Sequence, residues 1–304
     1  MKKLSFLVSL ITEDNDYQRL QASSAEQAAQ RLGADIKVIF AGNDSIRQSE
    51  QLLEAIQSPS SRPSAIVFEP AGTAMAQAAR AAVAAGIGWA VLNKEADYIP
   101  QLRRTSRVPV FSVGSDHDEI GRIQGEQLGA LLPQGGVVLC IQGPAGSSAA
   151  EQRAAGMNRS KPANIDLRTI RGNWTKESGY NAARSWLRLS TSHAAPIGAV
   201  ASHNDAMALG ASQAFEDQSA GEKRTRLLGL PFLGCDGVPD TGQAWVRSGQ
   251  LAATVITPPN AGIAIEIAAK TLQTGMPSPE HTVVPSVGFP SLKELAAKAR
   301  KVEP

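Results

Sequence analysis

Polar side chains follow two short apolar runs in the second half of the chain. Asn204 and Asp205 come just after residues 197–202, and Asp236 comes just after residues 230–234. Short apolar runs of this length are typical of buried strands. In open sheets of parallel strands, small ligands bind outside the carboxyl ends of the strands. The carboxamide and the carboxylates therefore predict a ligand-binding site at one edge of a sheet.

Two other patterns could hold an ion, and each has a simpler explanation. His117 lies between Asp116 and Asp118, but no second set of metal ligands accompanies it. The glycine-rich turn at residues 143–148 lacks the lysine of a phosphate-binding loop. The chain also has no Gly-x-Ser-x-Gly turn and no metalloprotease helix motif. We therefore expect no metal, no cofactor and no catalytic residues.

The bulk composition is that of an ordinary globular protein. The chain has 304 residues, of which 42% are hydrophobic and 19% are charged, and its net charge is +2. This length exceeds what one core usually fills, so we expect two domains. The basic residues are scattered, whereas a nucleic-acid surface needs clustered Lys and Arg. We expect no nucleic-acid partner.

The start of the chain leaves the compartment open. Residues 1–11 have the basic head and apolar run of a signal peptide, but acidic residues follow at once without a small-x-small cleavage site. We interpret them as the first core strand, in a protein that is cytoplasmic if Met1 is the native start, and periplasmic or in the cell envelope if a leader is missing. No apolar run reaches the roughly 20 residues that span a bilayer. Cys140 and Cys235 lie in apolar runs and are expected to be buried free thiols, with a disulfide as the alternative.

Strand and helix patterns alternate along the whole chain, which predicts parallel sheets covered by helices. The expected strands are residues 4–10, 36–40, 65–68, 89–92, 108–113, 136–141, 165–170, 197–202, 230–234, 251–256 and 282–284. The expected helices are residues 17–32, 45–56, 75–85, 119–132, 148–157, 178–189, 206–216, 260–274 and 291–301.

The alternation restarts near residue 115, which predicts two similar lobes. We expect an α/β protein of two Rossmann-like, doubly wound parallel-sheet lobes. Residues 1–114 with about 258–285 form the N-terminal lobe, and residues 115–257 with about 286–304 form the C-terminal lobe. Three chain crossings between the lobes would make a hinge. A cleft between hinged lobes is a favoured ligand site.

Four segments of this chain resemble a known family. They are Ser202-His203-Asn204-Asp205-Ala206-Met207-Ala208-Leu209-Gly210, Gly234-Cys235-Asp236-Gly237, residues 249–254 and residues 143–157. With them the chain resembles, over nearly its whole length, the type 1 periplasmic sugar-binding proteins of the ribose- and galactose-binding kind. It is also similar to the effector domains of LacI-type repressors.

The resemblance implies a role for particular residues of the second lobe. Arg153 matches the arginine that clamps the sugar, and Trp174 matches a stacking aromatic. Asn204 and Asp236 match the amide and carboxylate that contact the sugar. Thr257 stands at a hinge position. Planar Asp, Asn and Arg groups can each bind two adjacent hydroxyls, and an aromatic face packs on the apolar face of a sugar ring.

The first lobe departs more from the family. Lys94 replaces the arginine that many members carry, and a point charge makes a neutral pentose less expected. Gln18 stands where a second aromatic is frequent. A sugar remains the expected class, with a polyol, an amino sugar or another polar metabolite as alternatives. The ligand residues implied for this lobe are Asp14, Asn15, Tyr17, Glu69, Asn93 and Lys94.

Several of these residues also have a structural alternative. Asn204 or Asp205 could cap the following helix, and capping is the role that we expect for Asp205. Arg153 could be an exposed charge on a helix, and Trp174 could cover the edge of the core. Only the folded chain can distinguish these roles.

The leading hypothesis is a monomeric, non-catalytic solute-binding protein that closes on a sugar-like ligand. It would present its closed form to an ABC permease or a membrane sensor. One alternative is a free-standing effector domain of LacI-like type that signals to a regulator. The weaker alternative is an α/β enzyme acting on a sugar or a nucleotide.

Overall fold

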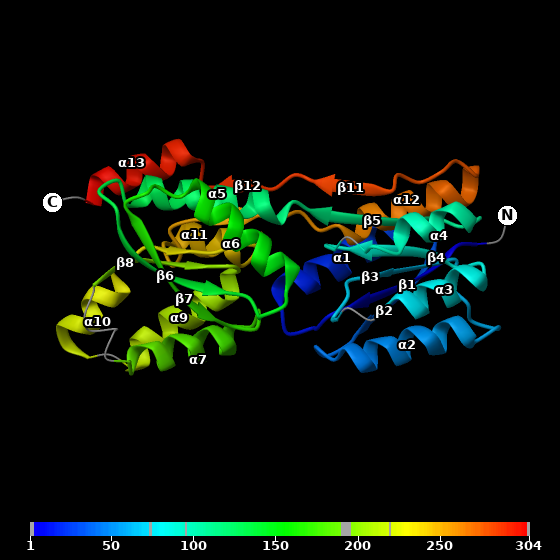
Figure 1. Cartoon of the computed structure of the whole chain (residues 1–304), viewed down its shortest axis with the longest axis horizontal. Helices are drawn as coiled ribbons and strands as arrows, with labels where there is room; N and C mark the ends of the chain where they lie inside the picture. Colours follow the sequence, from blue (N-terminus) through cyan, green and yellow to red (C-terminus); the bar gives the residue numbers. More distant parts are fainter. Residues whose placement is uncertain (1–2, 73–74, 95, 190–195, 219, 303–304) are drawn as a thin grey trace. The chain divides into compact units, whose positions relative to one another are not determined.

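The computed structural model describes residues 3–72, 75–94, 96–189, 196–218 and 220–302 (Figure 1). The chain divides into two compact units, which we call lobe 1 and lobe 2. Lobe 1 consists of Met1–Ser115 and Pro259–Val284, and lobe 2 consists of Asp116–Pro258 and Pro285–Pro304. The chain therefore passes from one lobe to the other three times.

Lobe 1 contains a six-stranded sheet in which neighbouring strands run parallel, in the order β11-β5-β4-β3-β1-β2. The strands are β1 (Ser5–Leu10), β2 (Asp35–Phe40), β3 (Ala65–Phe68), β4 (Gly88–Leu92), β5 (Val110–Ser115) and β11 (His281–Val284). The helices are α1 (Asp16–Arg31), α2 (Ser45–Gln57), α3 (Ala76–Ala84), α4 (Ile99–Thr105) and α12 (Ala261–Thr274). The returning segment thus adds one helix and one edge strand to this lobe.

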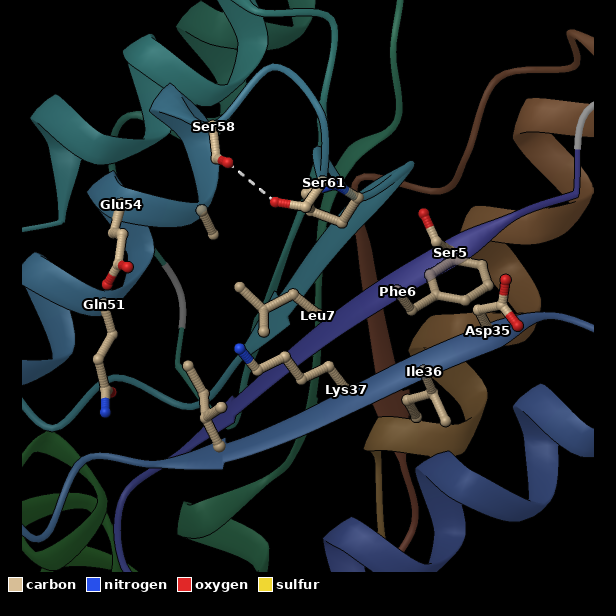
Figure 2. Close-up of a pocket in the computed structure, with 13 residues that line it drawn as sticks. Ser5, Phe6, Leu7, Asp35, Ile36, Lys37, Gln51, Glu54, Ser58 and Ser61 are labelled. Carbon is tan, nitrogen blue, oxygen red and sulfur yellow. Dashed lines mark hydrogen bonds between the residues drawn. The ribbon is translucent and has the colours of Figure 1, made fainter.

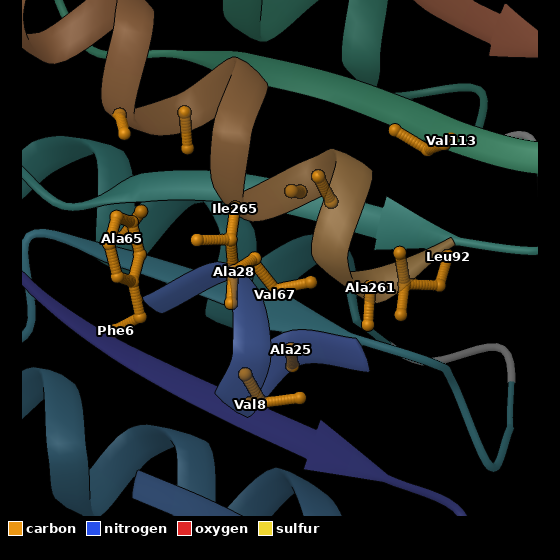
Figure 3. Packing of buried hydrophobic residues seen from close by; sticks show 14 of the residues in the cluster. Phe6, Val8, Ala25, Ala28, Ala65, Val67, Leu92, Val113, Ala261 and Ile265 are labelled. Carbon is orange, nitrogen blue, oxygen red and sulfur yellow. The ribbon is translucent and has the colours of Figure 1, made fainter. Parts of the chain in front are cut away.

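Helices cover both faces of the lobe 1 sheet. Successive side chains of a strand point to opposite faces, so the apolar strands present apolar side chains to helices on each side. On one face, Phe6 and Val8 pack with Ala25 of α1 and Ile265 of α12 (Figure 3). On the other face, Leu7 lies in a second cluster with residues of α2 and α3. Strands buried on both faces read as continuous apolar runs, which is why these strands could be located in the sequence.

Lobe 2 contains a four-stranded parallel sheet in the order β7-β6-β8-β9. Its strands are β6 (Gly136–Gln142), β7 (Ile165–Arg171), β8 (Ile197–Ser202) and β9 (Phe232–Leu233). Its helices are α5 (His117–Leu131), α6 (Ser148–Ser160), α7 (Lys176–Leu187), α9 (Asp205–Gln218), α10 (Gly221–Leu228), α11 (Gly242–Ser248) and α13 (Leu292–Val302). A separate pair, β10 (Thr254–Ile256) and β12 (Val287–Phe289), is antiparallel.

The predicted α/β fold of two lobes with parallel sheets is confirmed, and the differences are local. The expected strand 251–256 does not extend the series, because its core, β10, pairs antiparallel with β12 of the returning segment. Only isolated bridges join residues near β10 to the β9 region. Three short helices, α4, α10 and α11, were not predicted, since seven or eight residues span about two turns and show too little periodicity.

Glycines let the helices α5 and α6 pack with their backbones in close contact. A Cβ atom built on Gly121 of α5 would lie 2.0 Å from the carbonyl oxygen of Arg153 in α6. A Cβ atom on Gly156 of α6 would lie 2.0 Å from the carbonyl oxygen of Asp118 in α5. Because both obstacles are backbone atoms, neither can rotate away. This contact also sets the position of the α6 turn that carries Arg153.

We predict that Gly156→Ala lowers the free energy of unfolding by about 1–3 kcal/mol, the usual cost of overpacking, despite the better helix propensity of alanine. Gly229→Ala is the matched control, because a Cβ atom there meets only ordinary contacts at 3.4 Å and beyond. The control should change stability by no more than about 0.5 kcal/mol. Urea unfolding followed by circular dichroism measures both. Equal stability of the two variants would contradict this account of the α5–α6 contact.

Candidate functional site

Arg153 is the centre of a polar cluster in lobe 2. Its side chain is buried, although it carries a full charge. One terminal nitrogen, Nη1, donates to the backbone carbonyl of His203 and lies 4.0 Å from the Asp236 carboxylate. The guanidinium carbon lies 5.6 Å from the centre of the Trp174 ring. The structure thus brings together three of the residues predicted for this lobe, and Arg153 is not an exposed helix charge.

Asp236 presents its carboxylate from an unusual backbone conformation. Its φ is +103°, in the region that side chains other than glycine rarely adopt. Its amide donates to the carbonyl of Val255 at 3.0 Å, and its own carbonyl accepts from the amide of Thr257 at 3.0 Å. The side chain retains 13% exposure, so the carboxylate remains partly accessible.

Asn204 caps α9, and it does so in place of Asp205. Its Oδ1 accepts from the amide of Met207 at 2.9 Å, and its Nδ2 donates to the carbonyl of Trp174 at 2.8 Å. Asn204 is only 1% exposed. The capping role expected for Asp205 was wrong, because the residue before it occupies the N-cap position. A sugar contact by Asn204 stays a prediction.

The Asp205 side chain points to a neighbouring turn instead. Its Oδ2 accepts from the amide of Gly237 at 2.8 Å, and its Oδ1 accepts from the hydroxyl of Thr254 at 2.7 Å. Burial, followed by the nearby Asp236 carboxylate, raises the pKa of Asp205 well above its ordinary value. Asp205 is buried and therefore belongs to the interior of the lobe.

His203 is a buried member of the cluster that sequence reasoning did not identify. Its Nδ1 accepts from the amide of Gly143 at 3.3 Å, and its ring is stacked 6.5 Å from the Trp174 ring. Burial, followed by the charge of Arg153, lowers the pKa of His203 to about 3. A single histidine after a strand carries no signal that would reveal this contact with Trp174.

Thr257, which is predicted to lie at the hinge, is also buried. Its hydroxyl oxygen lies 3.6 Å from the Sγ of Cys235. Cys235 and Cys140 are free and buried, as expected for thiols in apolar runs. The hinge role of Thr257 stays a prediction.

In lobe 1, Tyr17 and Asn93 form one part of the predicted set. The Tyr17 hydroxyl accepts from Nδ2 of Asn93 at 3.5 Å and from Nε2 of Gln21 at 3.2 Å. Oδ1 of Asn93 accepts from the Asn260 side chain. Asn15 is the N-cap of α1, and its side chain accepts from the Gln18 amide at 3.2 Å. Tyr17 is 7% exposed, so its predicted stacking face has little exposure in this structure.

Glu69 is held by Gln18, which stands where the family often has an aromatic residue. Nε2 of Gln18 donates to the Glu69 carboxylate at 2.8 Å, and Oε1 of Gln18 accepts from the amide of Ile11 at 2.9 Å. Gln18 thus fixes the direction of a carboxylate where an aromatic would offer a stacking face. Asp14 is exposed and contacts Thr12.

Lys94 is the least constrained of the predicted residues. Within the described part of the chain it makes no hydrogen bond or ion pair, and it does not pair with Glu69.

The two carboxylates beside His117, which were considered as possible metal ligands, make structural contacts instead. Asp116 caps α5 by accepting from the Glu119 amide at 2.9 Å, and Asp118 pairs with Arg159.

A cavity of about 430 Å³ lies elsewhere in lobe 1, between β1, β2 and α2 (Figure 2). Its lining includes Leu7, Lys37, Gln51 and Glu54 and none of the predicted ligand residues.

Among the described helices, none combines the length and apolar character needed to cross a membrane.

We predict that His203 makes the protein sensitive to acid. Its folded-state pKa lies below its ordinary value of 6.5, so stability present above pH 6.5 is lost as pH falls towards 3. Between pH 7 and 4.5 this group removes about 2.5 kcal/mol from the free energy of unfolding. In His203→Asn, whose Oδ1 can still accept from Gly143, the difference between the two pH values should shrink by that amount. Urea titrations at both pH values test this, and an unchanged difference would contradict it.

Comparison with known proteins places the whole chain in one family. Residues 6–275 match the family model described as periplasmic binding protein domain. The ribose import binding protein of Salmonella typhimurium is 28% identical over 280 residues, which cover 90% of this chain and 86% of that protein. The D-apiose import binding protein of Actinobacillus succinogenes is 26% identical over 283 residues, covering 90% and 84%.

Solved structures show the same fold. A periplasmic solute-binding protein of an ABC transporter from Actinobacillus succinogenes, with bound D-allose, has a TM-score of 0.81 at 24% identity, over 97% of this chain and 100% of that one. The myo-inositol-binding protein of Caulobacter has a TM-score of 0.77 at 21% identity, over 98% and 97%. These likenesses confirm the fold that the resemblance implied. The chain belongs to the periplasmic binding protein family and has its type 1 fold.

Proposed function

We propose that this protein is a non-catalytic binding protein for a monosaccharide or a closely related polyol. The observation that carries the proposal is the Arg153, Asp236 and Trp174 cluster at the strand ends of lobe 2. A guanidinium and a carboxylate can each bind two adjacent hydroxyls, and an indole face packs on the apolar face of a sugar ring. The names of the relatives, which include ribose and D-apiose import proteins, support the same class.

In this proposal, residues of lobe 1 distinguish between sugars. Glu69, held by Gln18, offers an oriented acceptor, and Lys94 offers an unpaired ammonium group among the described residues. A fixed acceptor and an ammonium donor favour a ligand with several hydroxyls over an apolar one. Asp14, Asn15, Tyr17 and Asn93 complete the proposed set.

We further propose that one bound sugar contacts residues of both lobes and that the lobes close around it. Contacts made only in the closed form are what shift the population towards it. The three chain crossings provide the hinge, with Thr257 at one of them. We also propose that this closed form is presented to an ABC permease by a monomer located outside the cytoplasmic membrane, and the names of relatives that are import binding proteins support this.

We predict that a sugar panel contains at least one ligand that raises the melting temperature. The panel is D-ribose, D-allose, L-arabinose, D-galactose and myo-inositol, and a ligand at about 100 times its Kd adds about 2.7 kcal/mol of stability. Arg153→Ala and Asp236→Ala should abolish the shift, and the sugar should be recovered chemically unchanged. Arg168→Ala, at an exposed ion pair with Asp166 in the same lobe, is the control and should keep it.

Two results would count against this proposal. The absence of any shift across the panel would reject the sugar class. A normal shift in both the Arg153 and the Asp236 variants would reject the site instead, provided that circular dichroism shows both variants folded.

We also predict that saturation with the sugar that gives the largest shift lowers the radius of gyration measured by small-angle X-ray scattering. The reason is that lobes which share one ligand must approach each other. Asp236→Ala, measured at the same sugar concentration, should retain the ligand-free value. Tight binding without any change in the scattering of the wild type would contradict closure while leaving sugar binding intact.

A further inference from the structure

The turn that carries Asp236 needs support from its surroundings. Asp236 has φ +103° and the next residue, Gly237, has φ +56°, so two consecutive residues adopt left-handed conformations. A residue other than glycine in such a region costs of order 1–3 kcal/mol and persists only where its neighbours fix it. The direction of the Asp236 carboxylate therefore depends on what holds this turn.

Asp205 contacts the turn on both sides of Asp236. Its backbone amide donates to the carbonyl of Cys235 at 2.7 Å, and its Oδ2 accepts from the amide of Gly237 at 2.8 Å. Its Oδ1 accepts from the hydroxyl of Thr254 in β10 at 2.7 Å. One residue thus ties the start of α9 to the turn and to β10. The bond to Gly237 fixes the plane of the peptide that joins it to Asp236.

The backbone closes tightly around this carboxyl group. A Cβ atom built on Gly234 or on Gly242 would lie 2.0 Å from one of its two oxygens. Asp205 itself is 4% exposed. The enclosure leaves the group no second rotamer, so its two acceptor oxygens have fixed directions.

Neither capping nor packing explains an acidic side chain at this place. Asn204 already caps α9. An apolar residue of similar size would fill the space without the cost of burying a carboxyl group. What an apolar residue cannot supply is an acceptor for the Gly237 amide.

We propose that Asp205 is a positioning residue for ligand binding, which fixes the Asp236–Gly237 peptide and thereby aims the Asp236 carboxylate. Asp205 itself does not touch the ligand. The inference rests on the proposed function, because it takes Asp236 as a sugar contact.

The test compares two changes at Asp205 that differ in the acceptor. Asp205→Asn keeps an oxygen for the Gly237 amide, and its N–H group can donate to the Thr254 hydroxyl oxygen in place of the bond that the Thr254 hydroxyl now donates. Asp205→Leu keeps the branched shape, with a larger volume, and removes both acceptors. Asp205→Ala removes them without adding volume and replaces the leucine variant if that variant does not fold. Thr254→Val removes only the second hydrogen bond. Ala211→Gly is the control for stability, because it destabilises the lobe from a buried position within α9, away from the turn.

Two readouts are measured on the full chain. Hydrogen exchange of the Gly237 amide, followed by NMR, reports the turn without any sugar. Calorimetric titration with the five compounds of the panel, D-ribose, D-allose, L-arabinose, D-galactose and myo-inositol, reports the affinity. Asp205→Leu should speed Gly237 exchange at least 30-fold and weaken binding at least 10-fold. Asp205→Asn, Thr254→Val and Ala211→Gly should stay within about threefold of the wild type in both.

Unchanged Gly237 exchange in Asp205→Leu and Asp205→Ala would overturn the inference. An equal loss of affinity in Ala211→Gly would do so as well, because the effect would then follow stability rather than the turn. If the wild type binds none of the five compounds of the panel, the proposed function fails in its sugar class. Gly237 exchange still decides in that case whether Asp205 fixes the turn.

Discussion

Hydrogen bonds from buried side chains to the backbone hold the strand ends on which the rest of the structure depends. In lobe 1, Nε2 of Gln48 donates to the carbonyl of Glu69 at 2.8 Å. In lobe 2, Nε2 of Gln124 donates to the carbonyls of Ser202 at 2.7 Å and of Gly234 at 2.9 Å. A buried carbonyl without a partner is costly, so these ends cannot shift independently of the helices behind them. Because the strand ends are held in this way, the backbone that carries the side chains following them is held as well.

The buried positive charge of Arg153 in lobe 2 is also held by contacts with the backbone and with neighbouring side chains. Arg153 is 6% exposed, yet its guanidinium contacts a carbonyl, an indole ring and a carboxylate. The close approach of Gly121 to its backbone places the helix turn that carries it. His203 remains neutral beside this charge because it is buried. A guanidinium held in this way loses little freedom when a ligand binds, which favours affinity.

The predicted site residues were assigned with unequal success. Arg153, Trp174 and Asp236 do lie together. The α6 helix that carries Arg153 follows β6, Trp174 follows β7 and Asp236 follows β9, and the carboxyl ends of these parallel strands lie at the same edge of the sheet. The role expected for Asp205 was wrong, since capping depends on which of two adjacent residues adopts the N-cap conformation. Gln18 was recognised as unusual, but its hold on Glu69 spans 51 positions and leaves no trace in local pattern.

The sequence by itself determined the order of the longer strands and helices, the two-lobed α/β class and the polar character of the strand ends. These follow from local periodicity and residue type, which act over a few neighbouring positions. Only the tertiary structure decided that β10 pairs with β12 and that Asp205 meets Gly237 and Thr254. Such contacts join residues tens of positions apart, and they are selected by packing and by the need to satisfy buried polar groups. No local pattern encodes that choice.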